Sequence, residues 1–289
     1  MLVGLEGRIS LAISRDHGVF AQTSVTQVFL GGISVGLVTA LSYIAVILIV
    51  SLVSPKTVPR GTQSALENPV SIKEAMLGVW PISVLVVVVF GGMFSGLFTA
   101  TEAGAVGSAA AFLLAAATRK LSRKAARNAL VETLTTTASL FVIAIGAALF
   151  TRFLGLSGAS RFIVSFIADQ ELSYPMLMIG MVLIYLFLGM FMEPFGAMLV
   201  TLPVFLPIIE NQGISLIWFG VFVVKLLEIG MITPPVGMNV FVIRSVAGTY
   251  ASLGAIFRGV TTFLIADLIV VTLVIAIPAL VLMLPSVAG

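Results

Sequence analysis

The chain has 289 residues, of which 60% are hydrophobic and only 9% are charged, and its mean hydropathy is +1.20. This composition excludes an ordinary soluble domain and predicts an all-α polytopic membrane protein. The formal net charge of +3 is too small to suggest nucleic-acid binding, and the absence of cysteine excludes disulfides, iron–sulfur clusters and thiol catalysis.

Residues 1–16 mix charges with short apolar runs and lack the order of a signal peptide, so we assign them no span. The first transmembrane helix is predicted over 28–53, closed by Ser54 and Pro55. The polar segment 56–74 that follows is predicted to be a loop containing a short amphipathic piece.

Two further spans are predicted over 77–98 and 104–118. After them comes the densest positive charge of the chain, which marks the cytoplasmic side of the membrane. Two spans separate this cluster from the basic 56–74 loop, so both are expected inside. The cluster contains Arg119, Lys120, Arg123, Lys124 and Arg127.

A fourth span is predicted over 134–150, followed by an interfacial helix over 160–170. The long apolar stretch 175–210 is interrupted by glycines and prolines, and we interpret it as a re-entrant hairpin that enters from outside with its tip at 189–196. A single span with several kinks explains the same composition about equally well. The last span is predicted over 259–284.

A broken helix over 215–245 is the most informative prediction. Its centre, 230–239, reads G-M-I-T-P-P-V-G-M-N. Pro234 and Pro235 cannot donate hydrogen bonds, so the carbonyls four residues earlier are expected to lose their helical partners. Gly237 tolerates left-handed backbone and Thr233 adds a hydroxyl. The alternative is a simple proline kink, which transmembrane helices tolerate.

Unpaired carbonyls inside a membrane require protein, water or an ion as partner, so a desolvated cation is a natural ligand for this break. Pro194 cannot donate to Met190 either, and Gly189 can turn the chain, so the hairpin tip is also expected to expose carbonyls. Secondary transporters build their sites from such pairs of interrupted helices.

Five charged residues within or beside the apolar segments need partners. Lys225 and Glu228 are three residues apart and are predicted to pair, with snorkelling as the alternative. Asp267 is interpreted as a structural partner in the bundle. Glu193 could assist a cation or accept from a donor in the hairpin. Arg244 is a candidate for a substrate carboxylate, or equally a cytoplasmic anchor.

Four motifs in register resemble the large membrane subunit of tripartite ATP-independent periplasmic (TRAP) transporters. They are G-G-M-F-S-G at 91–96 with T-E-A at 101–103, L-G-M-F-M-E-P at 188–194, T-L-P-V-F-L-P at 201–207, and E-I-G-M-I-T-P-P-V-G-M-N at 228–239. The resemblance covers 18–285.

The resemblance implies a multi-pass protein of the bacterial inner membrane, with the elevator fold of the wider ion-transporter superfamily and two inverted repeats. It implies sodium-coupled uptake of organic anions, such as C4-dicarboxylates, from a periplasmic binding protein, together with a small membrane subunit. No cofactor is implied other than the coupling ion. The implied sodium ligands are carbonyls of Gly189, Gly230, Thr233 and Val236; Glu193, Pro194, Pro234, Pro235, Gly237 and Asn239 are further site candidates.

The sequence departs from the family before Gly18, because an earlier repeat with its own hairpin, broken helix and sodium site is expected there. We therefore expect a largely complete second repeat, a mostly missing first repeat and a product that cannot transport alone. A stand-alone sodium-coupled anion symporter of the same superfamily is the alternative function. The sequence shows no pair of carboxylates and no nucleophile beside a base, so we do not expect an enzyme.

The sequence predicts five divisions of the chain. They are an unmatched, out-of-frame segment at 1–16, the end of the first repeat with a linker at 17–76, scaffold helices and an interfacial arm at 77–170, the hairpin and broken helix of the transport domain at 171–247, and the last span at 248–289.

Overall fold

The computed structural model describes residues 25–53, 72–119, 121–170, 173–247 and 251–288. All regular secondary structure in these ranges is helical, which confirms the predicted all-α class. The predictions for 1–16 and for most of the 56–74 loop lie outside the described residues. Five described helices are long and apolar enough to cross a membrane: α2 (Val25–Val53), α7 (Arg123–Ser157), α9 (Tyr174–Phe191), α10 (Pro194–Asn211) and α13 (Leu253–Ala276).

Helix α2 confirms the first predicted span and begins three residues earlier than expected. It packs along α14 (Ala279–Ala288), α13 and α11 (Leu216–Gly230). Gly31 lets α2 approach α14 closely, because a Cβ on Gly31 would stand 3.0 Å from Val281 Cγ1 and 3.1 Å from the Val281 carbonyl oxygen.

The second predicted span is a helical run made of α4 (Ile72–Val86), the π-helical turn η1 (Val87–Gly91) and α5 (Gly92–Phe94). It ends four residues before its predicted end. The third, α6 (Ala100–Ala117), begins earlier than predicted because Thr99 and Glu102 form a capping box. The Thr99 hydroxyl accepts from the Glu102 N–H, and the Glu102 carboxylate accepts from the Thr99 N–H at 2.7 Å.

Helix α7 corrects the predicted boundaries of the fourth span. It is a single helix of 35 residues rather than a short span after a basic loop. The Ser122 hydroxyl accepts from the Ala125 N–H and so starts the helix within the basic cluster. Helix α8 (Ala159–Asp169) follows, close to the predicted 160–170 helix.

The predicted last span is also corrected, because it is divided in two. Helix α13 starts at Leu253, after the N-cap Ser252, and stops before Ile277 and Pro278. Pro278 has no N–H to continue the helical ladder, and α14 begins again at Ala279.

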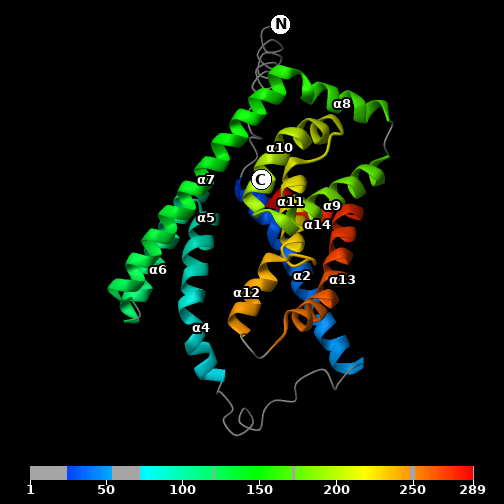
Figure 1. The fold of residues 1–289 in the computed structure, drawn as a ribbon. Coiled ribbons are helices and arrows are strands. Elements are labelled where there is room, and N and C mark those ends of the chain that lie inside the picture. The colour runs from blue at the N-terminus through cyan, green and yellow to red at the C-terminus, as the bar shows by residue number, and fades with distance from the viewer. Residues whose placement is uncertain (1–24, 54–71, 120, 171–172, 248–250, 289) are drawn as a thin grey trace.

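The described helices form two groups (Figure 1). The inner group, α2, α9, α10, α11, α13 and α14, supplies every residue of the hydrophobic core cluster. The outer group, α4 to α7, stands to one side and touches the inner group through contacts of α7 with α10, and the Phe90 ring of η1 packs edge to face on Phe29 of α2 with 6.2 Å between centroids. The core therefore surrounds α11, where the broken helix begins.

Candidate functional site at two helix breaks

Helices α9 and α10 form a hairpin. Only Met192 and Glu193 join them, both in extended backbone conformation. The Thr201 hydroxyl donates to the Tyr185 hydroxyl at 3.0 Å. A straight helix would separate these residues by about 24 Å, so the chain folds back on itself. The fold-back of the chain, with its turn inside the predicted 189–196 tip, is confirmed over the single kinked span, and its re-entrant path in the membrane stays a prediction.

Glu193 starts the second arm of this hairpin. Its carboxylate accepts from the Gly196 N–H at 3.1 Å, and Pro194 occupies the first helical position, where its missing N–H costs nothing. The Gly196 N–H is therefore a hairpin donor to Glu193, which is one of the two roles predicted for this carboxylate. The side chain itself is exposed.

The broken helix is also confirmed. Helix α11 ends at Gly230 and α12 (Met238–Ala247) resumes after a seven-residue irregular segment. Gly237 has a φ of +56°, in the left-handed region that favours glycine. The Pro234–Pro235 peptide bond is cis. Both prolines are exposed, whereas Gly230 and Gly237 are buried.

One expectation about this break was wrong. The Gly230 carbonyl does not lack a partner, since it accepts from the Thr233 N–H at 3.0 Å. The Met231 carbonyl accepts from the Asn239 N–H at 3.1 Å. The prolines do remove the ordinary helical donors, but the irregular backbone brings other N–H groups to the same oxygens. The Thr233 hydroxyl donates to the Ile229 carbonyl at 2.7 Å.

Several other carbonyls at the breaks keep both lone pairs. No N–H or hydroxyl of the described residues donates to the carbonyls of Gly189, Thr233 or Val236, and the same holds for those of Met190, Ile232, Pro234 and Pro235. The implied sodium ligands are therefore among the free acceptors of the two breaks, together with the second lone pair of the Gly230 oxygen. Among the described residues no three His, Asp or Glu side chains gather to hold a metal, so a cation here would depend on such oxygens.

Gly189 and Gly230 bring the two breaks into backbone contact. A Cβ on Gly230 would stand 2.6 Å from the Gly189 Cα and 3.1 Å from the Leu186 carbonyl oxygen. A Cβ on Gly189 would stand 3.0 Å from the Gly230 Cα. Only glycine on both sides permits this approach, so the hairpin tip and the broken helix meet as predicted.

A buried ion pair lies on the same helix before the break. Lys225 Nζ is 2.8 Å from Asp267 Oδ1 on α13, and the two side chains are 7% and 1% exposed. The Tyr43 hydroxyl of α2 donates to Asp267 Oδ2 at 2.7 Å. Lys225 also reaches Glu228, as predicted, but at 3.4 Å. The nearer partner is Asp267, whose predicted role as a structural partner is confirmed.

Burial of Lys225 excludes snorkelling, the alternative that the sequence left open for it. The contacts of Asp267 with Lys225 and Tyr43 were not predicted from the sequence. Opposite charges in the interiors of two apolar helices were the available signal. Arg244 donates to the Ala251 carbonyl at 2.6 Å, a contact with the loop that follows α12.

Apolar helices of membrane length define a polytopic membrane protein, and its helical hairpin and broken helix are in contact. A family model described as the tripartite ATP-independent periplasmic transporter, DctM component, matches residues 10–280. The chain belongs to this family. Its members are permeases of the bacterial inner membrane, not enzymes.

Individual relatives agree with the family match. The chain is 35% identical over 275 residues to a C4-dicarboxylate TRAP transporter large permease protein of Pseudomonas aeruginosa, covering 94% of this chain and 62% of that protein. It is 32% identical over 279 residues to a sialic acid TRAP transporter large permease protein of Vibrio cholerae, covering 93% and 62%. An isethionate TRAP transporter permease protein of Oleidesulfovibrio alaskensis is 29% identical over 267 residues, covering 91% and 41%. The chain thus spans at most about three fifths of the length of these relatives.

Proposed function

We propose that this chain is the large permease subunit of a TRAP transporter and that its two helix breaks bind a sodium ion that drives uptake of an organic anion. The observation that carries the proposal is the contact of Gly189 with Gly230. It joins the last turn of α9 to the last residue of α11. Both are carboxyl ends of helices, which carry the negative end of the helix dipole.

Two such ends repel each other unless a cation lies between or beside them. Sodium is a hard cation, and secondary transporters coordinate it with unwound carbonyls and with the carboxyl ends of half-helices. The proposed ligands are the carbonyls of Gly189, Gly230, Thr233 and Val236. The Thr233 hydroxyl already donates to Ile229, and its oxygen retains lone pairs for the ion.

The substrate class rests on the relatives. Their names give C4-dicarboxylate, sialic acid and isethionate as what they transport, and all three are organic anions. We extend that class, with sodium symport, to this chain. Its proposed partners are a small membrane subunit and a periplasmic binding protein, which distinguishes it from a stand-alone symporter. In an elevator motion, the hairpin and broken helix would move against α4 to α7.

Sodium binding can be tested apart from transport. The purified chain in detergent is titrated with sodium chloride while its thermal unfolding is followed, and potassium chloride holds the ionic strength constant. A ligand that binds only the folded state stabilises it by about 1.4 kcal/mol at ten times its Kd. We expect a saturable rise of the melting temperature with sodium, and no such rise with potassium.

Thr233→Val tests the site, because it removes the hydroxyl and keeps the side-chain shape. We expect it to raise the sodium concentration needed for half-maximal stabilisation about tenfold, as for the loss of one ligand contact. Thr261→Val is the matched control, since that hydroxyl also donates to a carbonyl four residues earlier, but on α13. An equal response to sodium and potassium would contradict the proposed site. An equal effect of the two variants on the sodium response would contradict it as well.

Uptake is a separate measurement. The chain is reconstituted with a small membrane subunit and a binding protein in proteoliposomes, and accumulation of labelled succinate and of N-acetylneuraminate is followed with and without an inward sodium gradient. Accumulation that requires the gradient and the binding protein would support the proposed uptake and would contradict the sequence-based expectation that this chain cannot transport alone. Accumulation without the binding protein would favour the stand-alone symporter.

A further inference from the structure

Two buried polar contacts join α11 to α13. Near the start of α11, the Trp218 indole N–H donates to the Val274 carbonyl at 3.0 Å. Pro278 cannot supply the helical N–H for that carbonyl, so the indole takes its place. Nearer the break, Lys225 Nζ is 2.8 Å from Asp267 Oδ1. Both contacts lie in the interior, since Trp218 and Asp267 are each 1% exposed.

The two contacts have the same spacing on both helices. Seven residues separate Trp218 from Lys225 on α11. Seven residues also separate Asp267 from Val274 on α13. The two helices therefore run antiparallel, and each rises about 10.5 Å between the contacts. A slide of α11 along α13 would break both contacts at once, so together they fix the axial position of α11.

Lys225 is the one charged side chain among the buried residues of α11, and the others are apolar or glycine. Its contact with Glu228, at 3.4 Å, lies within α11 and fixes nothing between helices. Its contact with Asp267 joins two helices. A buried ion pair often adds no more stability than apolar side chains of similar volume, and its best-attested use is to set the register of the helices that it joins. We therefore interpret the pair of Lys225 and Asp267 as a register device.

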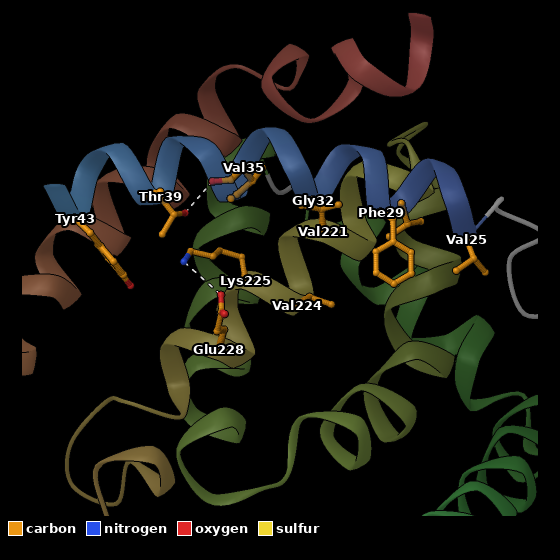
Figure 2. A pocket seen from close by; sticks show the side chains of 13 residues that line it. Val25, Phe29, Gly32, Val35, Thr39, Tyr43, Val221, Val224, Lys225 and Glu228 are labelled. Atoms are coloured by element: carbon orange, nitrogen blue, oxygen red, sulfur yellow. Dashed lines mark hydrogen bonds and ion pairs between the residues drawn. The ribbon is translucent and has the colours of Figure 1, made fainter. Parts of the chain in front are cut away.

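The Asp267 carboxylate is held at both of its oxygens. Lys225 approaches Oδ1, and the Tyr43 hydroxyl of α2 donates to Oδ2 at 2.7 Å. The Tyr43 ring also packs edge to face on Phe263 of α13, with 5.1 Å between centroids. In Figure 2 the Lys225 side chain points from α11 toward the end of α2 that carries Tyr43. With a partner on each oxygen, the carboxylate has one orientation and presents a fixed point to the lysine.

Gly230, the last residue of α11, does not fix its own position. It has no side chain, and its approach to Gly189 is a contact of backbone with backbone. Lys225 lies five residues before Gly230, about 7.5 Å along the helix. The ligands of a binding site must be held within about 0.5 Å of their working positions by the contacts that surround them. The ion pair is the buried polar contact of α11 nearest to the break, so it is the contact that places this end of the helix.

We propose that Asp267 is a positioning residue for the sodium site: through Lys225 it sets the axial position of α11 and so places the Gly230 carbonyl against Gly189. The inference rests on the proposed function for its effect on sodium, whereas the placement of the break is measured separately. Asp267 does not touch the ion. It acts through the length of its side chain, so a substitution that keeps its charge and changes its length should disturb the site.

The test variant is Asp267→Glu, which keeps the charge and adds one methylene. Tyr43→Phe is a second variant, because it releases one oxygen of the carboxylate and changes no charge. Val271→Ala is the control for lost stability: it lies one turn further along α13, is 3% exposed, and has neither polar contact. Glu228→Gln is the control for lost charge, at a carboxylate two residues before Gly230. Each purified chain is titrated with sodium chloride in detergent, and potassium chloride holds the ionic strength constant while thermal unfolding is followed.

We expect Asp267→Glu to raise the sodium concentration for half-maximal stabilisation about tenfold, as for the loss of a contact that supports a metal ligand. Tyr43→Phe should raise it by a smaller factor. Val271→Ala should lower the melting temperature and leave that concentration unchanged, and Glu228→Gln should leave it unchanged as well. No rise in Asp267→Glu and Tyr43→Phe would overturn the proposal. An equal rise in Val271→Ala would make Asp267 merely structural, and an equal rise in Glu228→Gln would show that charge acts rather than position.

Hydrogen–deuterium exchange distinguishes a failure of this inference from a failure of the proposed function. It is measured in potassium chloride without sodium on the segment 231–239, where the Thr233 and Asn239 N–H groups donate to carbonyls of the break. We expect faster exchange of this segment in Asp267→Glu than in Val271→Ala. If the unmodified chain shows no response to sodium, the proposed function fails, and the exchange still decides whether Asp267 positions the break. Equal exchange in the two variants would mean that it does not.

Discussion

The inner and outer helices use their polar groups in different ways. In the outer helix α7, the hydroxyls of Thr133, Thr135 and Ser139 each donate to a carbonyl four residues earlier in the same helix. In the inner group, the polar contacts of Lys225 and Tyr185 join different helices. Hydroxyls of the inner helices also donate within their own helix, as Thr261 does on α13, but among the described residues side-chain polar contacts that join two different helices occur in the inner group.

Burial follows the same division. The largest fully buried side chains, such as Trp218 and Phe222 of α11, lie in α9, α10 and α11 of the inner group, except Val240 in α12, and none lies in the outer group. The Trp218 indole N–H donates to the Val274 carbonyl on α13, and its ring stacks on Phe222 at 4.8 Å. Substitutions in the inner group should therefore cost stability through lost contacts between helices, and those in the outer group should cost little.

The largest effect is expected for Lys225→Met, which leaves Asp267 buried with its charge unpaired. Loss of one partner of a buried pair costs about 3 to 5 kcal/mol. The free energy of unfolding is measured in mixed detergent micelles with increasing sodium dodecyl sulfate. The double variant Lys225→Met with Asp267→Asn should recover part of the loss, because it removes the orphaned charge. If Lys225→Met were as stable as the unmodified chain, the inner helices would not depend on this contact for their stability.

The second-largest loss in the free energy of unfolding is expected for Gly230→Ala, at the contact of the two breaks. The added Cβ would stand 2.6 Å from the Gly189 Cα, so α9 and α11 must move apart. Overpacking of this kind costs about 1 to 3 kcal/mol. Gly146→Ala on α7 is the matched control, since a Cβ there meets no other atom within 4 Å. The two variants should differ in the same micelle assay, and equal stability would mean that the breaks do not depend on the contact.

A smaller loss is expected for Tyr185→Phe, which removes the hydroxyl that joins the two arms of the hairpin. The Thr201 hydroxyl can then donate to the Ala197 carbonyl, 2.9 Å away, so no buried donor is left without a partner. Hydrogen bonds between membrane helices contribute about 0.6 kcal/mol on average. The loss should be smaller than for Gly230→Ala in the same assay. A loss of several kcal/mol would mean that this bond, rather than packing, closes the hairpin.

The sequence predicted the features that local chemistry determines. Prolines and glycines located the breaks at 189–196 and 230–239, because they act through backbone sterics. It did not predict where the freed backbone groups would find partners. The bond from Asn239 to Met231 spans eight residues and depends on the path of an irregular loop.

Contacts between residues far apart in the sequence were the other feature that the sequence did not predict. Lys225 and Asp267 are 42 residues apart, and Tyr43 is further still, so only the packing of α2, α11 and α13 brings them together. The end of α13 was in principle predictable from Pro278. The apolar run beyond it resembles one continuous span, because hydropathy alone does not distinguish a short second helix from the end of the first.

The smallest effect is expected for Ile145→Ala on α7, whose side chain is 60% exposed. In a membrane such a side chain faces lipid in the folded protein and also when the helices separate. Its truncation therefore removes little that folding provides, because lipid tails are as apolar as the side chain. The cost should stay within about 0.5 kcal/mol. Ile209→Ala on α10 is the same truncation at a site that is 0% exposed, and it should cost about 2 to 5 kcal/mol because it opens a cavity. Equal costs at the two positions would show that Ile145 is covered by another helix in the membrane, and that the outer group, like the inner, derives stability from contacts between helices.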